Sequence, residues 1–165
     1  MTTTQVLVRL ADVQVLEGHA VLSCVGLGSC VGVAMIDPVA KVNGMAHIML
    51  PEAMTENPER PGKYANTAIV HMVETMERLG AQRSRLVAAV SGGAQVCFGP
   101  TVPAMLALGA RNVNAVQESL KFLKVKCAGE DVGGNVGRTL TFDSATGRVT
   151  VRTATSPDRV LCTLR

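Results

Sequence analysis

Aromatic residues are nearly absent from this chain, and its charges are close to balance. The 165 residues include no Trp, one Tyr and three Phe, so they offer few stacking platforms for single-stranded nucleic acid. A net charge of +3 is too small to indicate a surface built to follow a phosphate backbone. We therefore expect no nucleic-acid partner.

Paired cysteine motifs are also missing. The five cysteines are odd in number and widely scattered, and none forms a Cys-x-x-Cys pair: Cys24, Cys30, Cys97, Cys127 and Cys162. This spacing does not indicate a disulfide framework or a zinc site, and we expect neither a metal nor an organic cofactor. The first residues lack the basic and apolar regions of a signal peptide, which predicts a reduced, cytoplasmic protein.

No apolar run has the pattern of a membrane span. Residues 20–36 carry no charge, but glycines and serines interrupt them, so a buried strand, turn and strand explain them better. Hydrophobic residues make up 47% of the chain and charged residues 18%, which is a globular composition. We expect no membrane insertion and a single domain over residues 1–165, with residues 155–165 either a loose tail or a last strand.

Hydrophobic periodicity predicts a chain rich in strands with two main helices. The first helix is predicted over residues 62–79, and the second begins where Asn112 can cap it. Residues 97–108 show no clean period and are predicted to be irregular, and residues 130–137 form a glycine-rich loop. The predicted strands are residues 6–10, 13–16, 20–25, 30–36, 42–50, 86–90, 125–128, 139–143 and 148–152.

A cysteine after a glycine-rich turn and a histidine soon after it indicate a thiol nucleophile with its base. Cys30 ends the run Gly26-Leu27-Gly28-Ser29-Cys30, and His47 ends Gly44-Met45-Ala46-His47. An imidazole within reach of the thiol can take its proton and lower its pKa. Backbone N–H groups of residues 28–30 can hold an oxyanion. The alternative is a buried cysteine that acts as a small hydrophobe beside an ordinary glycine turn.

Spacing brings the two side chains together if their strands form a hairpin. The turn at residues 37–41 then places Cys30 and His47 at the same end of adjacent strands. A second glycine turn, Ser91-Gly92-Gly93, follows another buried strand. Gly92 and Gly93 are weaker candidates for lining the same site, because a glycine turn at a strand end often approaches a ligand.

Several segments carry a resemblance to a known family. The cysteine and histidine motifs, at this separation, are a specific signature of one family. Further segments that match the same family follow in order, from about residue 22 to residue 152. Taken together, they resemble the CheD family of chemotaxis receptor glutamine deamidases. The segments are Gly26–Cys30, Asp37-Pro38, Gly44–Pro51, Lys63-Tyr64, Gly92–Ala94, Gly109–Asn112, Glu130-Asp131 and Gly133-Gly134.

The resemblance implies an enzyme of the protein-glutamine glutaminase type. The family hydrolyses side-chain amides of selected glutamines in methyl-accepting chemotaxis receptors, giving glutamate and ammonia. It uses the cysteine of its Gly-Ser-Cys motif, here Cys30, and the histidine of its Ala-His motif, here His47. The implied fold is an α/β sandwich of mixed and antiparallel sheet layers backed by helices, similar to certain deamidating bacterial toxins. A CheC-type chemotaxis phosphatase is an implied partner.

One position departs from the family pattern. The family has a threonine six residues before the nucleophile as its third catalytic member, and here that residue is Cys24. A thiol is a weak hydrogen-bond donor and acceptor, so it orients an imidazole less firmly than a hydroxyl. Either Cys24 takes the role in a weakened form, or Ser23, Ser29 or a backbone carbonyl replaces it.

Two alternatives to a receptor deamidase stay open at the level of sequence. The weak third position is compatible with a degenerate module that only binds a phosphatase or receptors. Another thiol hydrolase, acting on small amides or peptides, would use the same pair of residues. The intact pair of Cys30 and His47 argues against the binding module.

Overall fold

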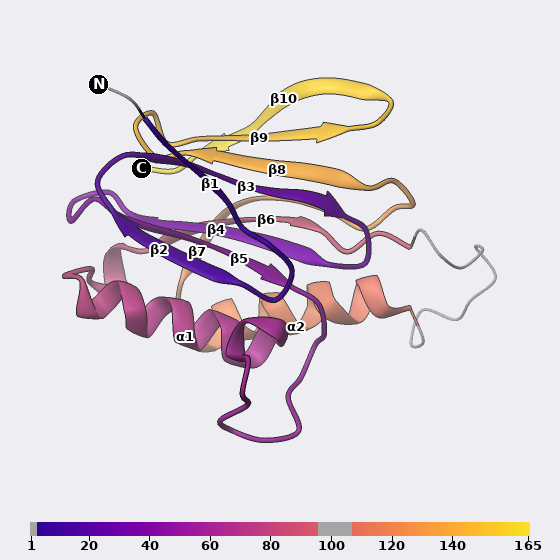
Figure 1. Ribbon diagram of the computed structural model, residues 1–165, viewed down its shortest axis with the longest axis horizontal. Helices are drawn as coiled ribbons and strands as arrows, with labels where there is room; N and C mark the ends of the chain where they lie inside the picture. The colour runs from indigo at the N-terminus through magenta and orange to yellow at the C-terminus, as the bar shows by residue number, and fades with distance from the viewer. Residues whose placement is uncertain (1–2, 96–106) are drawn as a thin grey trace.

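The protein has two packed β-sheets, and two helices cover the outer face of one of them (Figure 1). The computed structural model describes residues 3–95 and 107–165. The predicted α/β class, with mixed sheets and two main helices, is confirmed. The irregular segment predicted at residues 97–108 lies almost entirely outside the described residues.

The first sheet has the order β1-β3-β8-β9-β10. β1 pairs with β3 in parallel, and the other neighbours are antiparallel. Its strands are β1 (Thr4–Leu7), β3 (Ala20–Leu27), β8 (Arg138–Asp143), β9 (Arg148–Thr153) and β10 (Ser156–Thr163). The tail is thus a last strand rather than a loose end.

The second sheet has the order β2-β5-β4-β6-β7 and lies between the first sheet and the helices (Figure 1). β6 and β7 are parallel, and the other pairs are antiparallel. Its strands are β2 (Val13–Glu17), β4 (Val31–Asp37), β5 (Val42–Ile48), β6 (Val87–Gly92) and β7 (Lys126–Val132). β7 therefore continues through residues that the sequence predicted to be a loop.

Both helices, which the sequence periodicity predicted, turn an apolar face toward the second sheet. α1 (Ala65–Arg78) follows a short 3₁₀ turn, η1 (Pro61–Lys63), and a second such turn, η2 (Arg83–Arg85), precedes β6. On α2 (Leu108–Phe122), the stripe residues Val113, Val116 and Leu120 are buried. α2 begins four residues before Asn112, so the prediction that Asn112 caps this helix is wrong.

Two apolar cores lie on opposite faces of the second sheet, one against the helices and one against the first sheet. Every residue of β4, β5 and β6 is buried, because both faces of these central strands are covered. This explains why their sequences are nearly continuous apolar runs instead of alternating patterns. A polar side chain on these strands is therefore held in a dry environment.

Candidate active site

The hairpin of β4 and β5 places Cys30 near His47, as the sequence predicted. Gly32 pairs with His47, and Val31 pairs with Ile48. Cys30 directly precedes β4, so it lies diagonally across the pair from His47. Diagonal neighbours in an antiparallel pair have Cα atoms roughly 7–8 Å apart, which long side chains can bridge.

The two side chains share the face that looks toward the first sheet. A Cβ atom built on Gly32 would meet Leu140, Leu27 and Cys24, all in the core between the sheets. Residues directly opposite in a pair share a face, and so do residues two apart along a strand. His47, Gly32 and Cys30 therefore share this face, and Gly32 places no side chain between the other two.

His47 is fixed by the segment that joins β1 to β2. Its ring Nδ1 lies 3.1 Å from the carbonyl oxygen of Val8. Its backbone N–H donates to Asp12, and its backbone carbonyl accepts from Ala11. Since a carbonyl can only accept, Nδ1 carries the proton, and Nε2 of the neutral ring has a free lone pair.

The free ring nitrogen is the one suited to act as a base. The His47 side chain is buried, and its Nε2 has no hydrogen-bond partner among residues 3–95 and 107–165. An unpartnered polar atom in a dry site is costly and calls for a functional explanation. An arriving thiol proton would satisfy it.

Burial keeps both members of the pair neutral at rest. It raises the pKa of the half-buried Cys30 thiol above its usual value, although the residue's own backbone N–H opposes this. It lowers the pKa of His47, although the hydrogen bond to Val8 opposes this. The described residues show no hydrogen bond between the Cys30 thiol and His47. The predicted lowering of the thiol pKa by His47 is therefore wrong for this state of the protein.

Cys24 makes no hydrogen bond to His47 in the described structure. Its buried sulfur lies 3.8 Å from the carbonyl oxygen of Ala46, while the Val8 carbonyl holds His47. Burial, followed by the nearby Cys30 and Asp12, raises the Cys24 pKa far above its usual value, so it stays a neutral thiol. Of the sequence alternatives, the backbone carbonyl is the one observed.

Ser23 and Ser29 serve the site through their backbone atoms. The Ser23 carbonyl accepts from the Val8 N–H, which places the Val8 carbonyl beside His47. The Ser29 carbonyl accepts from the side chain of Asn112. No residue type marks Val8 as an orienting group, since a main-chain carbonyl supplies the contact.

The second glycine turn, residues 91–94, holds the cysteine loop, residues 28–30, through backbone hydrogen bonds. The Gly93 N–H donates to the Cys30 carbonyl at 2.9 Å, and the Ala94 N–H donates to the Gly28 carbonyl at 2.7 Å. Gly92 has a φ of +113°, and a Cβ atom there would collide with the Cys30 carbonyl. Glycine is required for both reasons. Gly92 and Gly93 thus position the loop.

Asn112 is a residue whose contribution the sequence analysis missed. It is fully buried in α2, and its amide nitrogen lies 2.9 Å from the carbonyl oxygens of both Ser29 and Met49. One side chain therefore joins the cysteine loop to the end of the strand that carries His47. The motif Gly-Ala-Arg-Asn is visible in the sequence, but the buried position of Asn112 depends on how α2 packs.

Neither a metal site nor a membrane helix is found among the described residues. These residues contain no group of three or more His, Cys, Asp or Glu side chains that could hold a metal ion. Within the same ranges, no helix is both long and apolar enough to cross a membrane. Cys24, Cys30, Cys127 and Cys162 are free thiols.

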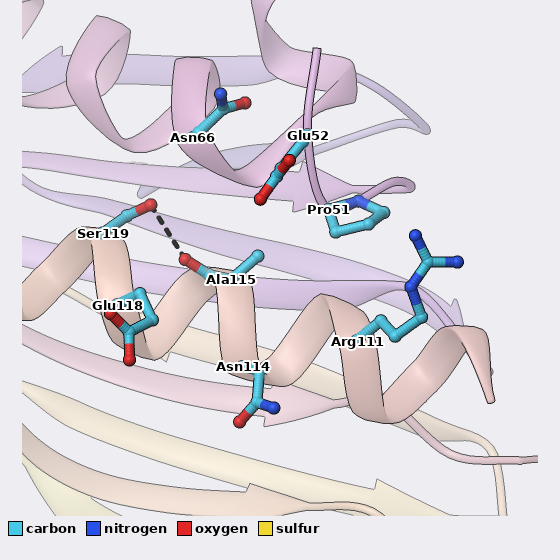
Figure 2. Close-up of a pocket in the computed structure, with 8 residues that line it drawn as sticks. All are labelled: Pro51, Glu52, Asn66, Arg111, Asn114, Ala115, Glu118 and Ser119. Carbon is cyan, nitrogen blue, oxygen red and sulfur yellow. Dashed lines mark hydrogen bonds between the residues drawn. The ribbon is translucent and has the colours of Figure 1, made fainter. Parts of the chain in front are cut away.

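A groove of about 420 Å³ lies between α2 and the segment that follows β5 (Figure 2). Arg111 extends from α2 toward Pro51 on the facing side, and Glu52 and Glu118 also line the groove. Cys30 and His47 do not line it. The groove is thus a separate surface, which begins where the chain leaves the strand that carries His47.

Comparison with known proteins shows the family. Residues 49–153 match the family model described as CheD chemotactic sensory transduction. The chain is 43% identical over 158 residues to a probable chemoreceptor glutamine deamidase CheD of Desulforamulus reducens, covering 95% of each chain. It is 41% identical over 145 residues to the chemoreceptor glutamine deamidase CheD of Thermotoga maritima, covering 88% of this chain and 89% of that one. The chain therefore belongs to the CheD family.

Proposed function

We propose that this protein hydrolyses the side-chain amide of glutamine residues in chemotaxis receptors, giving glutamate and ammonia. The observation that carries the proposal is the buried, unpartnered Nε2 of His47 on the same sheet face as Cys30. The relatives named chemoreceptor glutamine deamidase supply the substrate class. No metal or organic cofactor is required for this chemistry.

The first half of the reaction forms a thioester. The Cys30 sulfur attacks the glutamine Cδ as its proton passes to His47 Nε2. The C–N bond then breaks, and the imidazolium gives that proton to the departing amine, which leaves as ammonia. The Val8 carbonyl stabilises the imidazolium through Nδ1 during this step.

The second half returns the enzyme to its starting state. Neutral His47 takes a proton from water, and the resulting hydroxide attacks the thioester carbonyl. The C–S bond breaks to give the side-chain carboxylic acid, which releases its proton to solvent and leaves as glutamate, and the thiolate recovers a proton from His47. Backbone N–H groups of residues 28–30 are the proposed donors to the oxyanion in both halves.

We also propose the partners and the cellular compartment of this protein. Receptor glutamines lie on cytoplasmic helices, so the protein acts in the cytoplasm. A CheC-type phosphatase is the proposed second partner. The exposed Arg111 lines the groove between α2 and the segment after β5, and it is accessible to either partner.

Mass spectrometry of a receptor cytoplasmic fragment incubated with the protein tests this proposal. Each converted amide adds about 1 Da, and we expect this change with the wild type and not with Cys30→Ala. Cys127→Ala is the matched control, because Cys127 is an exposed free thiol on β7. A wild type that leaves the fragment unchanged would favour the binding module, and equal activity in Cys30→Ala would move the nucleophile elsewhere.

A further inference from the structure

Three successive carbonyl groups of the cysteine loop are each held by a different donor. The Ala94 N–H holds Gly28, the Asn112 side chain holds Ser29, and the Gly93 N–H holds Cys30. Two of these donors are backbone N–H groups, which any substitution other than proline leaves in place. Asn112 is the side chain in the set, so it can be tested directly.

The Ser29 carbonyl and the Cys30 N–H belong to the same peptide unit. That unit is planar and trans, so the two groups point in opposite directions. When Asn112 holds the carbonyl at 2.9 Å, it also fixes the direction of the Cys30 N–H at the other end of the plane. This N–H lies near the Cys30 sulfur, where it partly offsets the rise in thiol pKa caused by burial.

The second bond of Asn112 sets the position of the loop relative to the base. The same amide nitrogen donates to the Met49 carbonyl at 2.9 Å, two residues after His47. Asn112 is fully buried, and its Oδ1 has no hydrogen-bond partner among residues 3–95 and 107–165. The side chain therefore uses both of its N–H groups to span the nucleophile loop and the base strand.

We propose that Asn112 is a positioning residue that aims the Cys30 N–H at the reacting centre and holds the cysteine loop against the strand of His47. The proposal rests on the proposed function for its activity test alone. Donors directed at a developing oxyanion act in the transition state more than in substrate binding, so loss of their alignment lowers kcat more than it raises KM.

The chain offers a matched control in Asn43. It is fully buried on β5, and its amide nitrogen donates to the carbonyls of Gly18 and Leu16. Its Oδ1 also lacks a partner among the described residues. It lies four positions before His47, roughly 13 Å along the strand. Asn43→Ala therefore removes the same kind of bonds at a distance from the site.

The test compares Asn112→Ala and Asn112→Leu with Asn43→Ala. The leucine variant fills the buried space that Asn112 occupies, so it replaces the alanine variant in the test if that variant fails to fold. For Asn112 variants we expect kcat for the receptor fragment to fall about 10- to 100-fold with KM changed less than about threefold. We expect Asn43→Ala to lose thermal stability to a similar extent with kcat kept within about threefold.

A second readout does not depend on the receptor substrate. The rate of Cys30 alkylation by iodoacetamide, followed by peptide mass spectrometry against pH, reports the thiol pKa. We expect its midpoint to move upward in the Asn112 variants and to stay in place in Asn43→Ala. Equal kcat losses and equal alkylation profiles in the two sets would overturn the proposal. If the wild type fails to deamidate the receptor, the proposed function falls and the alkylation profiles still decide the role of Asn112.

Discussion

The two ends of the β4–β5 hairpin hold their buried ionisable groups in opposite charge states. At the turn, Asp37 is fully buried and accepts hydrogen bonds from Arg85 and from the N–H groups of Gln82, Ala40 and Val39. Burial alone would raise the pKa of Asp37, but these donors lower it to about 2. The Asp37 carboxylate is thus charged at neutral pH, and these hydrogen-bond donors stabilise its charge.

The open end keeps its ionisable groups neutral. Burial shifts the pKa of Cys30 upward and that of His47 downward, and His47 Nε2 is left without a partner in the described structure. A charge at this end forms only when a proton moves between the two groups during reaction. The same hairpin therefore stabilises the fold through a charged, hydrogen-bonded Asp37 at its turn, and it holds a neutral acid–base pair, Cys30 and His47, at its open end. Such perturbed groups cluster at functional sites.

His47→Gln tests the reactive end with the largest expected effect. The variant keeps a polar side chain but loses the basic ring nitrogen, so kcat for the receptor fragment should fall about 10³-fold. Mass spectrometry of the fragment measures the rate, and circular dichroism checks the fold. A loss smaller than about tenfold would show that His47 is not the general base.

Gly92→Ala tests how the open end is supported. The new Cβ atom would push on the Cys30 carbonyl at a φ of +113°, so we expect kcat to fall about 10-fold or more. Gly80→Ala is the matched control, because Gly80 has a φ of +103° with no atom within 4 Å of an added Cβ. Equal kcat losses in the two variants would contradict a role for Gly92 in holding the loop.

Asp37→Asn tests the stabilising end. The folded pKa lies below the usual value, so the contribution of Asp37 is present at neutral pH and lost as pH falls from about 5 toward 2. At pH 7 we expect the variant to lose about 2 kcal/mol of unfolding free energy, measured by urea titration. The difference from wild type should shrink toward pH 2. Equal stability at pH 7 would refute the contrast between the two ends.

Cys24 substitutions have the smallest expected effect on activity. Because the Val8 carbonyl orients His47, we expect Cys24→Ala and Cys24→Thr to keep kcat within about threefold of wild type. The receptor-fragment assay measures this, with thermal unfolding run in parallel to correct for changes in packing. A loss close to that of His47→Gln would restore Cys24 as an essential partner.

Local patterns in the sequence were enough to predict the β4–β5 hairpin, the two main helices and the placement of Cys30 and His47 at the same end of the hairpin. Each depends on periodicity and turn chemistry within a short segment. The Val8 carbonyl and Asn112 could not be predicted in the same way, because their roles arise from packing between distant segments. The pKa directions also required the fold, since they follow from how deeply the covering sheet buries the pair.

The pH dependence of Cys30 alkylation in the wild type and in His47→Gln tests most directly whether the pair is neutral at rest. We predict that the wild-type rate rises with a midpoint above the ordinary cysteine pKa, and that His47→Gln leaves this midpoint nearly unchanged. A wild-type rate that is already at its plateau below pH 7, and that loses this plateau in His47→Gln, would show a preformed thiolate–imidazolium pair and contradict the account.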